Sequence, residues 1–176
     1  MTEAFLRRLS RWQAEQQRDA VADVHVTAYQ GVAGDEFRDR RGFLDRFERH
    51  VQVTGFDMVV ADAGGLVGVC YGYRLDRTGD WWQGLTGGLP ADIEELTASG
   101  RVFQLAELMV RPARRRLGIA TRMGALLLAR LETDLVVADI ERGGVAGETL
   151  HAWGWSKLGE RDAASGREVW VRRPLR

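Results

Sequence analysis

The chain has 176 residues, of which 45% are hydrophobic and 28% are charged, and its 25 basic and 25 acidic side chains give a formal net charge of zero. This balance excludes a wholly basic nucleic-acid-binding protein and a highly charged disordered chain. The length suits one domain, residues 1–176, with one substantial core.

The chain has one cysteine, Cys70, so no internal disulfide can form, which is typical of a reducing compartment. No apolar run approaches the roughly 20 residues that span a bilayer. The first 17 residues mix charged and apolar side chains, unlike a signal peptide. We therefore expect a cytoplasmic protein without a membrane partner.

The N-terminal segment predicts a strand and an amphipathic helix. Residues 4–9 are a short apolar and basic run that suits an edge strand. Apolar side chains recur at helical spacing over residues 12–29, and Trp12 lies on that apolar, core-facing side. Gly31 and Gly34 end this predicted helix.

A second helix and a hairpin follow. Asp35 is placed to cap the helix, whose apolar face carries Phe37, Leu44, Phe47 and Val51. Residues 56–61 and 66–74 are rich in Val, Phe and Tyr and are separated by Ala63-Gly64-Gly65. This pattern predicts a β-hairpin.

The second half of the chain begins with a long segment, residues 75–101, which we expect to be a loop with one added helical turn at residues 90–96. A structureless loop of this length in a compact domain is usually functional. Beyond it, the pattern predicts a strand over residues 102–110 and a helix from Gly118 to about residue 131.

Three further elements complete the chain: a buried strand over residues 135–140, a helix over 145–153, and paired strands near 157–158 and 168–171 around a turn at 163–166. The overall order predicts an α/β (α+β) domain with a mixed central sheet of about six or seven strands flanked by about four helices.

Basic charge is concentrated where the strand 102–110 leads into the next helix. From Arg111 to Arg130 the sequence has six arginines and no acidic residue. Gly118 and Ala120 are small enough for another group to approach the backbone, and helix N-termini bind phosphate through unpaired N–H groups. The junction therefore predicts a compact phosphate-bearing ligand, although neither the Walker nor the Gly-X-Gly-X-X-Gly pattern is present.

The residues around this junction fall in a familiar order. Glu107-Leu108-Met109-Val110-Arg111-Pro112 is followed by Arg115-Arg116-Leu117-Gly118-Ile119-Ala120, and later by Ala146, Trp153-Gly154-Trp155 and Leu158-Gly159. These segments resemble the signature of the GNAT superfamily of acetyl-CoA-dependent N-acetyltransferases, Arg/Gln-X-X-Gly-X-Gly/Ala, and its C-terminal Gly-aromatic segment. The resemblance spans essentially the whole chain and implies a single-domain fold whose sheet is splayed between its fourth and fifth strands.

The resemblance also implies that acetyl-CoA is the cofactor. The backbone of Met109 and Val110 would pair with the pantetheine arm, opposite the strand 135–140. The CoA pyrophosphate would be held by the loop and the first helical turn, namely Arg115, Arg116, Leu117, Gly118, Ile119, Ala120 and Thr121.

Family chemistry is the direct attack of an amine on a thioester, and a carboxylate can take the amine proton directly or through water. Glu107 is the candidate base, with an ordinary structural carboxylate as the alternative. Many members carry a Tyr as general acid four residues before the Gly of the Gly-aromatic pair. Here Gly154 fixes that position as Leu150, which cannot donate a proton. Water, Tyr29, Tyr71 and Tyr73 are the alternative acids.

The acceptor pocket is expected across the sheet from CoA, built by the first two helices and the long loop. Paired tryptophans could stack on a planar or cationic substrate, or they could anchor the loop on the core. The aromatic residues that would line the pocket are Tyr29, Tyr71, Tyr73, Trp81 and Trp82. We expect His25 in the core, and no spacing of His, Cys and Asp suggests a metal site.

We therefore expect an N-acetyltransferase that moves an acetyl group from acetyl-CoA to a primary amine of a small molecule or peptide within a ternary complex. The alternative is a non-catalytic acyl-CoA-binding or regulatory domain, motivated by Leu150. A nucleic-acid partner is disfavoured by the neutral chain. The acceptor is left open among aminoglycosides, polyamines, amino acids and protein N-termini, and a homodimer is common in the family.

Overall fold

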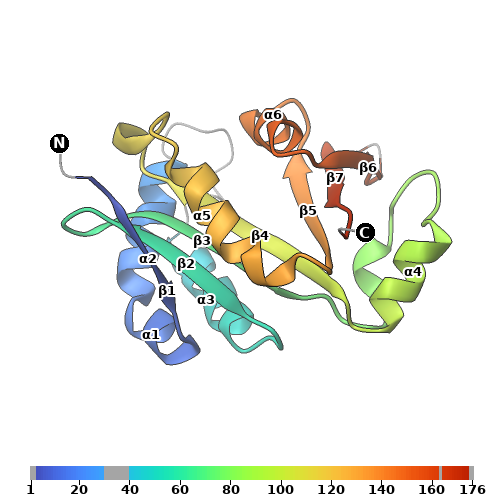
Figure 1. The fold of residues 1–176 in the computed structure, drawn as a ribbon, viewed down its shortest axis with the longest axis horizontal. Coiled ribbons are helices and arrows are strands. Elements are labelled where there is room, and N and C mark those ends of the chain that lie inside the picture. Colours follow the sequence, from blue (N-terminus) through green and yellow to red (C-terminus); the bar gives the residue numbers. More distant parts are fainter. Residues whose placement is uncertain (1–2, 30–39, 163, 175–176) are drawn as a thin grey trace. The chain divides into compact units, whose positions relative to one another are not determined.

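The structure of the chain, a computed structural model, describes residues 3–29, 40–162 and 164–174. Within these ranges seven strands form one mixed sheet, in the hydrogen-bonded order β1-β2-β3-β4-β5-β7-β6 (Figure 1). The predicted mixed α/β fold is therefore confirmed. The chain divides into two compact units, Met1–Tyr73 with Glu107–Arg130 and Arg74–Ala106 with Leu131–Arg176, so strand β4 contributes residues to both.

The first unit holds the N-terminal helices, the hairpin and the strand-to-helix junction. Its elements are β1 (Phe5–Leu9), α1 (Arg11–Gln16), α2 (Arg18–Ala28), α3 (Arg40–Val51), β2 (Asp57–Asp62), β3 (Leu66–Arg74), the end of β4 (Val102–Val110), η3 (Pro112–Arg114) and α5 (Ile119–Leu128). As predicted, β1 is an edge strand, antiparallel to β2. The hairpin is also confirmed, with Gly64 and Gly65 turning the chain at φ values of 77° and 141°.

The helix predicted over residues 12–29 is in fact two helices. Gln17 ends α1 and precedes α2, with a φ of −95° and a ψ of 6°. Ser10 starts α1 with a capping box, in which its hydroxyl accepts from the Gln13 N–H and its own N–H donates to the Gln13 side chain. Trp12 therefore lies on a separate short helix, where it is 67% exposed, and the prediction that it faces the core is wrong.

Helices α2 and α3 form the aromatic part of the first unit's core. Phe47 and Val51 of α3 are buried, as the apolar spacing predicted, whereas Leu44 is only half-buried and the buried residue of that turn is Phe43. Val21 and Val24 are the buried valines of α2. His25 is 1% exposed, as expected for a core residue, and its ring stacks on that of Phe43 at 4.3 Å. The predicted helix end, cap and first apolar residue, at Gly31, Gly34, Asp35 and Phe37, lie outside the described residues.

The second unit is built on the other half of the sheet. Its elements are η2 (Asp80–Trp82), α4 (Ala91–Ala98), the start of β4, β5 (Leu135–Glu141), α6 (Val145–Ala152), β6 (Ser156–Glu160) and β7 (Arg167–Arg172). Strands β4 and β5 are parallel, pairing Val102–Gln104 with Leu135–Val137. Strand β7 is antiparallel to both of its neighbours, β5 and β6.

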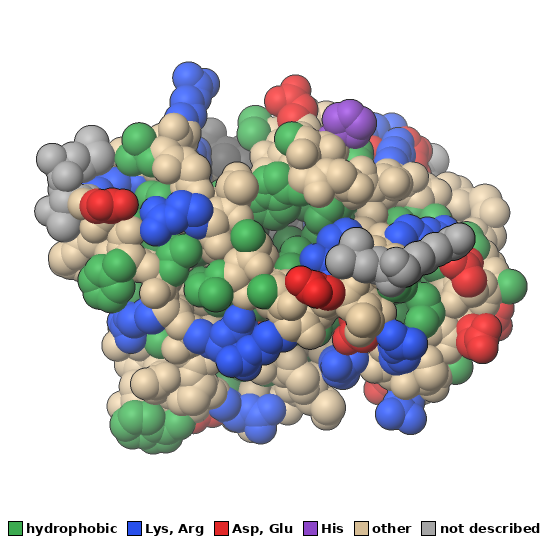
Figure 2. All heavy atoms as spheres, in the orientation of Figure 1, with side chains coloured by type: hydrophobic (Ala, Val, Ile, Leu, Met, Phe, Trp, Pro, Cys, Tyr) green, Lys and Arg blue, Asp and Glu red, His purple; other side chains and the backbone are tan. Residues whose placement is uncertain are grey.

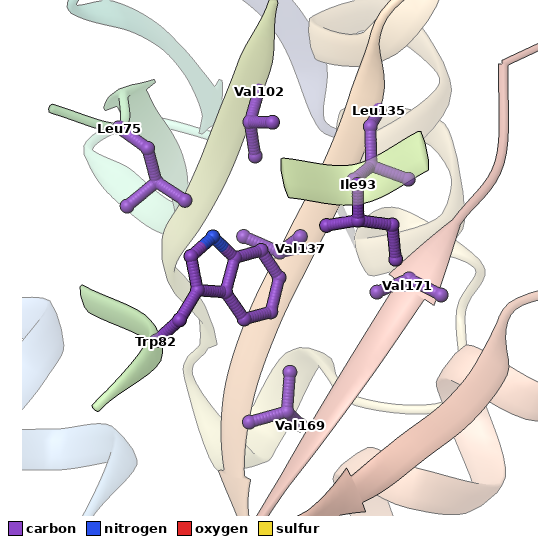
Figure 3. Packing of buried hydrophobic residues seen from close by; sticks show 8 residues of the cluster. All are labelled: Leu75, Trp82, Ile93, Val102, Leu135, Val137, Val169 and Val171. Atoms are coloured by element: carbon purple, nitrogen blue, oxygen red, sulfur yellow. The ribbon is translucent and has the colours of Figure 1, made fainter. Parts of the chain in front are cut away.

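The segment 75–101, predicted to be a long loop, is an ordered part of this unit. Helix α4 begins after Pro90 and makes about two turns rather than the predicted one. Trp82 buries its indole in the core, and its Nε1–H donates to the Thr97 hydroxyl at 3.0 Å. Figure 3 shows this indole beside Val137, among the buried side chains of Leu75, Trp82, Ile93, Val102, Leu135, Val137, Val169 and Val171. The prediction failed because the segment is held by contacts from distant parts of the chain: Leu75, Trp82 and Ile93 are buried in the core, and the Thr86 N–H donates to the Glu160 carbonyl at 2.8 Å.

Within the described ranges, no helix combines the length and the apolar character that crossing a bilayer requires.

Two tryptophan substitutions test the buried position of Trp82 and the exposed position of Trp12. We expect Trp82→Ala to lower the free energy of unfolding by about 3–5 kcal/mol, because it empties a buried site and removes the hydrogen bond to Thr97. Trp12→Ala, at an exposed site, should change it by no more than about 0.5 kcal/mol. Chemical denaturation of both variants checks this, and equal losses would contradict the assignment.

Candidate functional site

The junction between β4 and α5 is fastened to the first unit by arginine side chains. The Arg111 N–H donates to the Val67 carbonyl at 2.8 Å. Its guanidinium donates to the Leu66 carbonyl at 2.8 Å and to the Thr27 hydroxyl at 3.0 Å. Arg111 therefore ties the end of β4 to β3 and α2, and its side chain is engaged by the protein itself.

Arg115 braces the same loop three residues beyond Pro112. Its Nε donates to the Val110 carbonyl at 3.2 Å, and its Nη2 donates to the Ala28 carbonyl at 2.6 Å. Ala28 is the last residue of α2, where a positive charge also interacts favourably with the helix dipole. Two of the six arginines between residues 111 and 130 therefore hold the loop in place, which was not predicted from the sequence.

The loop that Arg115 braces has an unusual backbone. Arg116 has a φ of 65°, the one positive value among the described non-glycine residues, and Gly118 has a φ of 77° where it precedes α5. A Cβ on Gly118 would meet nothing within 4 Å, so glycine is favoured here by backbone conformation and not by space. The first turn of α5 has no acidic residue, and its first N–H groups have no acceptor within the helix. This geometry suits an anion.

The candidate base, Glu107, forms an ion pair with helix α3. The Nη2 atom of Arg46 lies 3.1 Å from Oε1 of Glu107. The Glu107 side chain is 11% exposed, whereas that of Arg46 is 31% exposed. Within the pair, the Glu107 carboxylate is thus nearly covered, whereas the Arg46 side chain is partly open to solvent.

Tyr71 and Tyr73 lie beside this ion pair. They are two residues apart on β3, so they point to the same face of the sheet. Tyr71 is fully buried, and its hydroxyl lies 2.9 Å from Nδ1 of His50; the half-buried Tyr73 ring lies 4.8 Å from the His50 ring. Burial and then the charge of Glu107 raise the pKa of both phenols. Both therefore stay protonated near neutral pH.

His50 completes the cluster and was missed by sequence reasoning. It lies one helical turn after Arg46 on α3, a spacing that places both side chains on one face. Burial and then the charges of Arg46 and Arg49 lower the pKa of His50 from 6.5 to about 4. Its imidazole is therefore neutral near pH 7. The spacing of four residues between Arg46 and His50 was the one signal in the sequence. That spacing alone does not indicate a role for His50, because the tyrosines beside it lie on β3.

The remaining predicted site residues are more scattered. Tyr29 is half-buried at the end of α2, with its ring 4.8 Å from that of His25. Trp82 belongs to the core of the second unit, and Trp81 lies edge-on to it under the Arg161 guanidinium, 4.3 Å from the ring centre. Both tryptophans are thus engaged by their own unit. Leu150 is 3% exposed, with no group that could donate a proton.

The first unit therefore holds two features in one body: the anion-suited junction and a polar cluster, defined as Arg46, His50, Tyr71, Tyr73 and Glu107. Figure 2 shows Lys and Arg side chains at several separate positions on the visible face, with Asp and Glu side chains among them.

No protein-family model and no curated protein matches the sequence. Solved structures do match. An acetyltransferase described as histone acetyltransferase HPA2 and related acetyltransferase, from Corynebacterium glutamicum, is 15% identical with a TM-score of 0.68, covering 100% of this chain and 98% of that one. The PaiA N-acetyltransferase of Thermoplasma acidophilum, in complex with coenzyme A, is 11% identical with a TM-score of 0.63, covering 97% and 99%.

A third similar structure is the GNAT-like decarboxylase GphF in complex with isobutyryl-CoA. It is 15% identical, with a TM-score of 0.61, and the match covers 96% of this chain and 98% of that one. The chain therefore has the fold of GNAT acetyltransferases, and the resemblance predicted from its sequence is confirmed for the fold.

The low pKa of His50 makes a testable contribution to stability. Below pH 6.5 the unfolded chain takes up a proton at this ring, whereas the folded chain does so only near pH 4, so the free energy of unfolding falls as the pH drops through that window. His50→Gln removes this titration, so the free energy of unfolding should decrease less between pH 6.5 and pH 4 than it does in the parent chain. We expect the difference to be on the order of 1 kcal/mol, because the half-buried ring is partly screened by solvent.

Denaturation curves at pH steps from 7 down to 4 measure this slope. His151→Gln, at an exposed position on α6, is the matched control and should keep the slope of the parent chain. A His50→Gln slope equal to that of the parent would contradict the inferred neutral state of His50.

Proposed function

We propose that the chain is an N-acetyltransferase of the GNAT type, which transfers an acetyl group from acetyl-CoA to a primary amine of a small molecule or peptide in the cytoplasm. The observation that carries the proposal is the β4–α5 junction. There a braced loop with two positive-φ residues, Arg116 and Gly118, leads into a helix N-terminus without acidic residues, within the GNAT fold.

The junction fits the phosphate groups of CoA. The backbone N–H groups of residues 116–121 would hold the pyrophosphate, with the positive end of α5 favouring its charge, while the Arg115 N–H donates to the Pro112 carbonyl. The exposed Arg116 adds a cation, and the backbone of Met109 and Val110 would pair with the pantetheine arm. PaiA is in complex with coenzyme A and GphF with isobutyryl-CoA, which supports the same ligand class here.

Bound acetyl-CoA would supply an activated thioester, and the polar cluster would prepare the amine. An ammonium ion cannot attack until it loses a proton, and Glu107 would accept that proton directly or through one water molecule. Arg46 fixes the orientation of the Glu107 carboxylate through their ion pair. Tyr73 is protonated and only half-buried, which makes it a better candidate proton donor than the fully buried Tyr71.

Removing the proposed base should slow the reaction. We expect Glu107→Gln to lower kcat by about 10²- to 10⁴-fold, the usual contribution of a positioned general base. Release of free thiol from acetyl-CoA in the presence of an amine panel measures the rate. Glu48→Gln, an exposed acid on α3, is the control and should retain the parent rate. A Glu107→Gln rate equal to the parent's across the pH range would rule out this role.

The proposed CoA loop has its own test. Gly118→Ala forces a side chain into a positive-φ position at a cost of about 1–3 kcal/mol, so the loop should change conformation and the affinity for acetyl-CoA should fall about tenfold or more. Gly84→Ala is the matched control. It too replaces a glycine with positive φ, 83°, and open space around its Cβ, but outside the proposed site.

Titration calorimetry with acetyl-CoA measures both variants. If Gly118→Ala and Gly84→Ala bind acetyl-CoA as tightly as the parent chain, the loop does not bind CoA.

A second candidate function is a non-catalytic acyl-CoA-binding or regulatory domain. It is favoured by one observation, the buried Leu150 at the position where many family members carry a proton-donating Tyr. Thioester turnover separates the two. Release of CoA with any member of an amine panel supports the enzyme, whereas tight acetyl-CoA binding without turnover on that panel supports the binding domain.

A further inference from the structure

We propose that Tyr71 holds His50 in the tautomer that carries its hydrogen on Nε2, so that His50 acts in the candidate site as a hydrogen-bond donor and not as a base. The assignment of the tautomer concerns the free protein. Its consequence for acetyl transfer rests on the proposed function and deepens it, because it leaves Glu107 as the proton acceptor of the polar cluster.

The Tyr71 hydroxyl is buried beside a single partner. Its ring packs against the aromatic side chains of Phe47 and Phe56, with ring centres 5.4 and 5.5 Å away. Among the described residues, the hydroxyl has one hydrogen-bond partner, Nδ1 of His50 at 2.9 Å. A buried O–H group that donates to nothing costs free energy, because it has left water without a replacement. The hydroxyl must therefore donate to Nδ1.

The direction of this hydrogen bond decides the tautomer. In a neutral imidazole one ring nitrogen carries a hydrogen and donates, and the other accepts. A hydrogen on Nδ1 would point at the phenol oxygen, and the Tyr71 O–H would then be buried without an acceptor among the described residues. With the hydrogen on Nε2, Nδ1 accepts from Tyr71 and the buried O–H is satisfied. The bond to Tyr71 therefore places the hydrogen of His50 on Nε2.

The surroundings of this imidazole keep it neutral. Burial disfavours its charged form, and Arg46, one turn earlier on the same face of α3, adds a positive charge that disfavours a second proton. The carboxylate that would favour one, Glu107 on β4, is bound to Arg46 at 3.1 Å. Asp45 and Arg49 are four residues apart on a neighbouring face of α3 and carry opposite charges. The neutral ring thus has one donor and one acceptor nitrogen.

Held in this way, His50 cannot accept a proton without losing its bond to Tyr71. Nε2 has no lone pair to offer, because it carries the hydrogen, and the lone pair of Nδ1 is taken by the phenol. Within the described part of the chain, Nε2 has no hydrogen-bond partner of its own, so its N–H can donate to an oxygen atom of a bound ligand. Tyr71 is thus a positioning residue, and His50 is the donor that it positions.

Nitrogen NMR spectra of the imidazole rings test the tautomer without any substrate. They are recorded on the isotope-labelled full-length chain at about pH 8, where histidine side chains are neutral. His50→Gln assigns the His50 signals, and the exposed His151 serves as the reference ring.

We expect the hydrogen of His50 on Nε2, and an Nδ1 signal displaced from that of His151 by the bond from Tyr71. Tyr71→Phe should abolish that displacement. A hydrogen on Nδ1 of His50 in the parent chain, or an Nδ1 signal that matches that of His151, overturns the inference. Both of these results come from the parent chain, so they do not depend on how well Tyr71→Phe folds.

Two substitutions of His50 test its role in acetyl transfer, measured as kcat/KM with acetyl-CoA and the amine panel. A glutamine offers an oxygen to the Tyr71 hydroxyl and N–H donors to a ligand, but it cannot act as a base, whereas a leucine offers neither group. We expect His50→Leu to lower kcat/KM by about tenfold, the contribution of one hydrogen bond, and His50→Gln to restore most of that loss.

A His50→Gln loss as large as the loss of about 10²-fold or more expected for Glu107→Gln would make His50 a base and overturn the inference. A parent rate in His50→Leu would overturn the donor role. Absence of turnover with every amine, while acetyl-CoA still binds, overturns the proposed enzyme and the catalytic part of this inference, and the spectra then decide the tautomer on their own.

Discussion

The hydrogen bonds from arginine side chains to backbone carbonyls are the interaction on which the candidate site depends. Arg111 and Arg115 hold the β4–α5 junction against β3 and the end of α2. Without them, the positive φ of Arg116 would be an isolated strained residue on an exposed loop. Because the guanidinium groups donate to carbonyl oxygens, these bonds occupy none of the backbone N–H groups of the loop.

The same type of bond recurs elsewhere in the chain, where arginine side chains join segments far apart in sequence. Examples are Arg8 to the Leu126 carbonyl, Arg74 to the Gly100 carbonyl, Arg101 to the Thr133 carbonyl and Arg172 to the Leu131 carbonyl. Each bond gives a backbone carbonyl a side-chain donor from a distant part of the chain, and the Leu131 carbonyl also accepts from the Asp134 N–H at 3.0 Å. Arginine side chains therefore have a structural role in much of the described chain.

Sequence patterns were sufficient to predict the elements that depend on residues close together in the chain. The β2–β3 hairpin follows from two glycines between β-branched and aromatic runs, and the buried strand β5 follows from its aliphatic run. The break at Gln17 was missed, because neither glycine nor proline marks it and the helical spacing of apolar residues continues past it. His50 was missed because its role depends on Tyr71, which is 21 residues away and reaches it only through the fold.

The division of the chain into two units has a spectroscopic consequence. Of the six tryptophans in the sequence, only Trp12 belongs to the first unit, which carries the polar cluster and the junction, and it is exposed. The other five belong to the second unit, where Trp82 and Trp155 are buried. Intrinsic fluorescence will therefore be dominated by the second unit and will report chiefly on its packing. Events in the first unit will be reported mainly by Trp12, the most exposed of the six, whose emission an aqueous quencher reaches most readily.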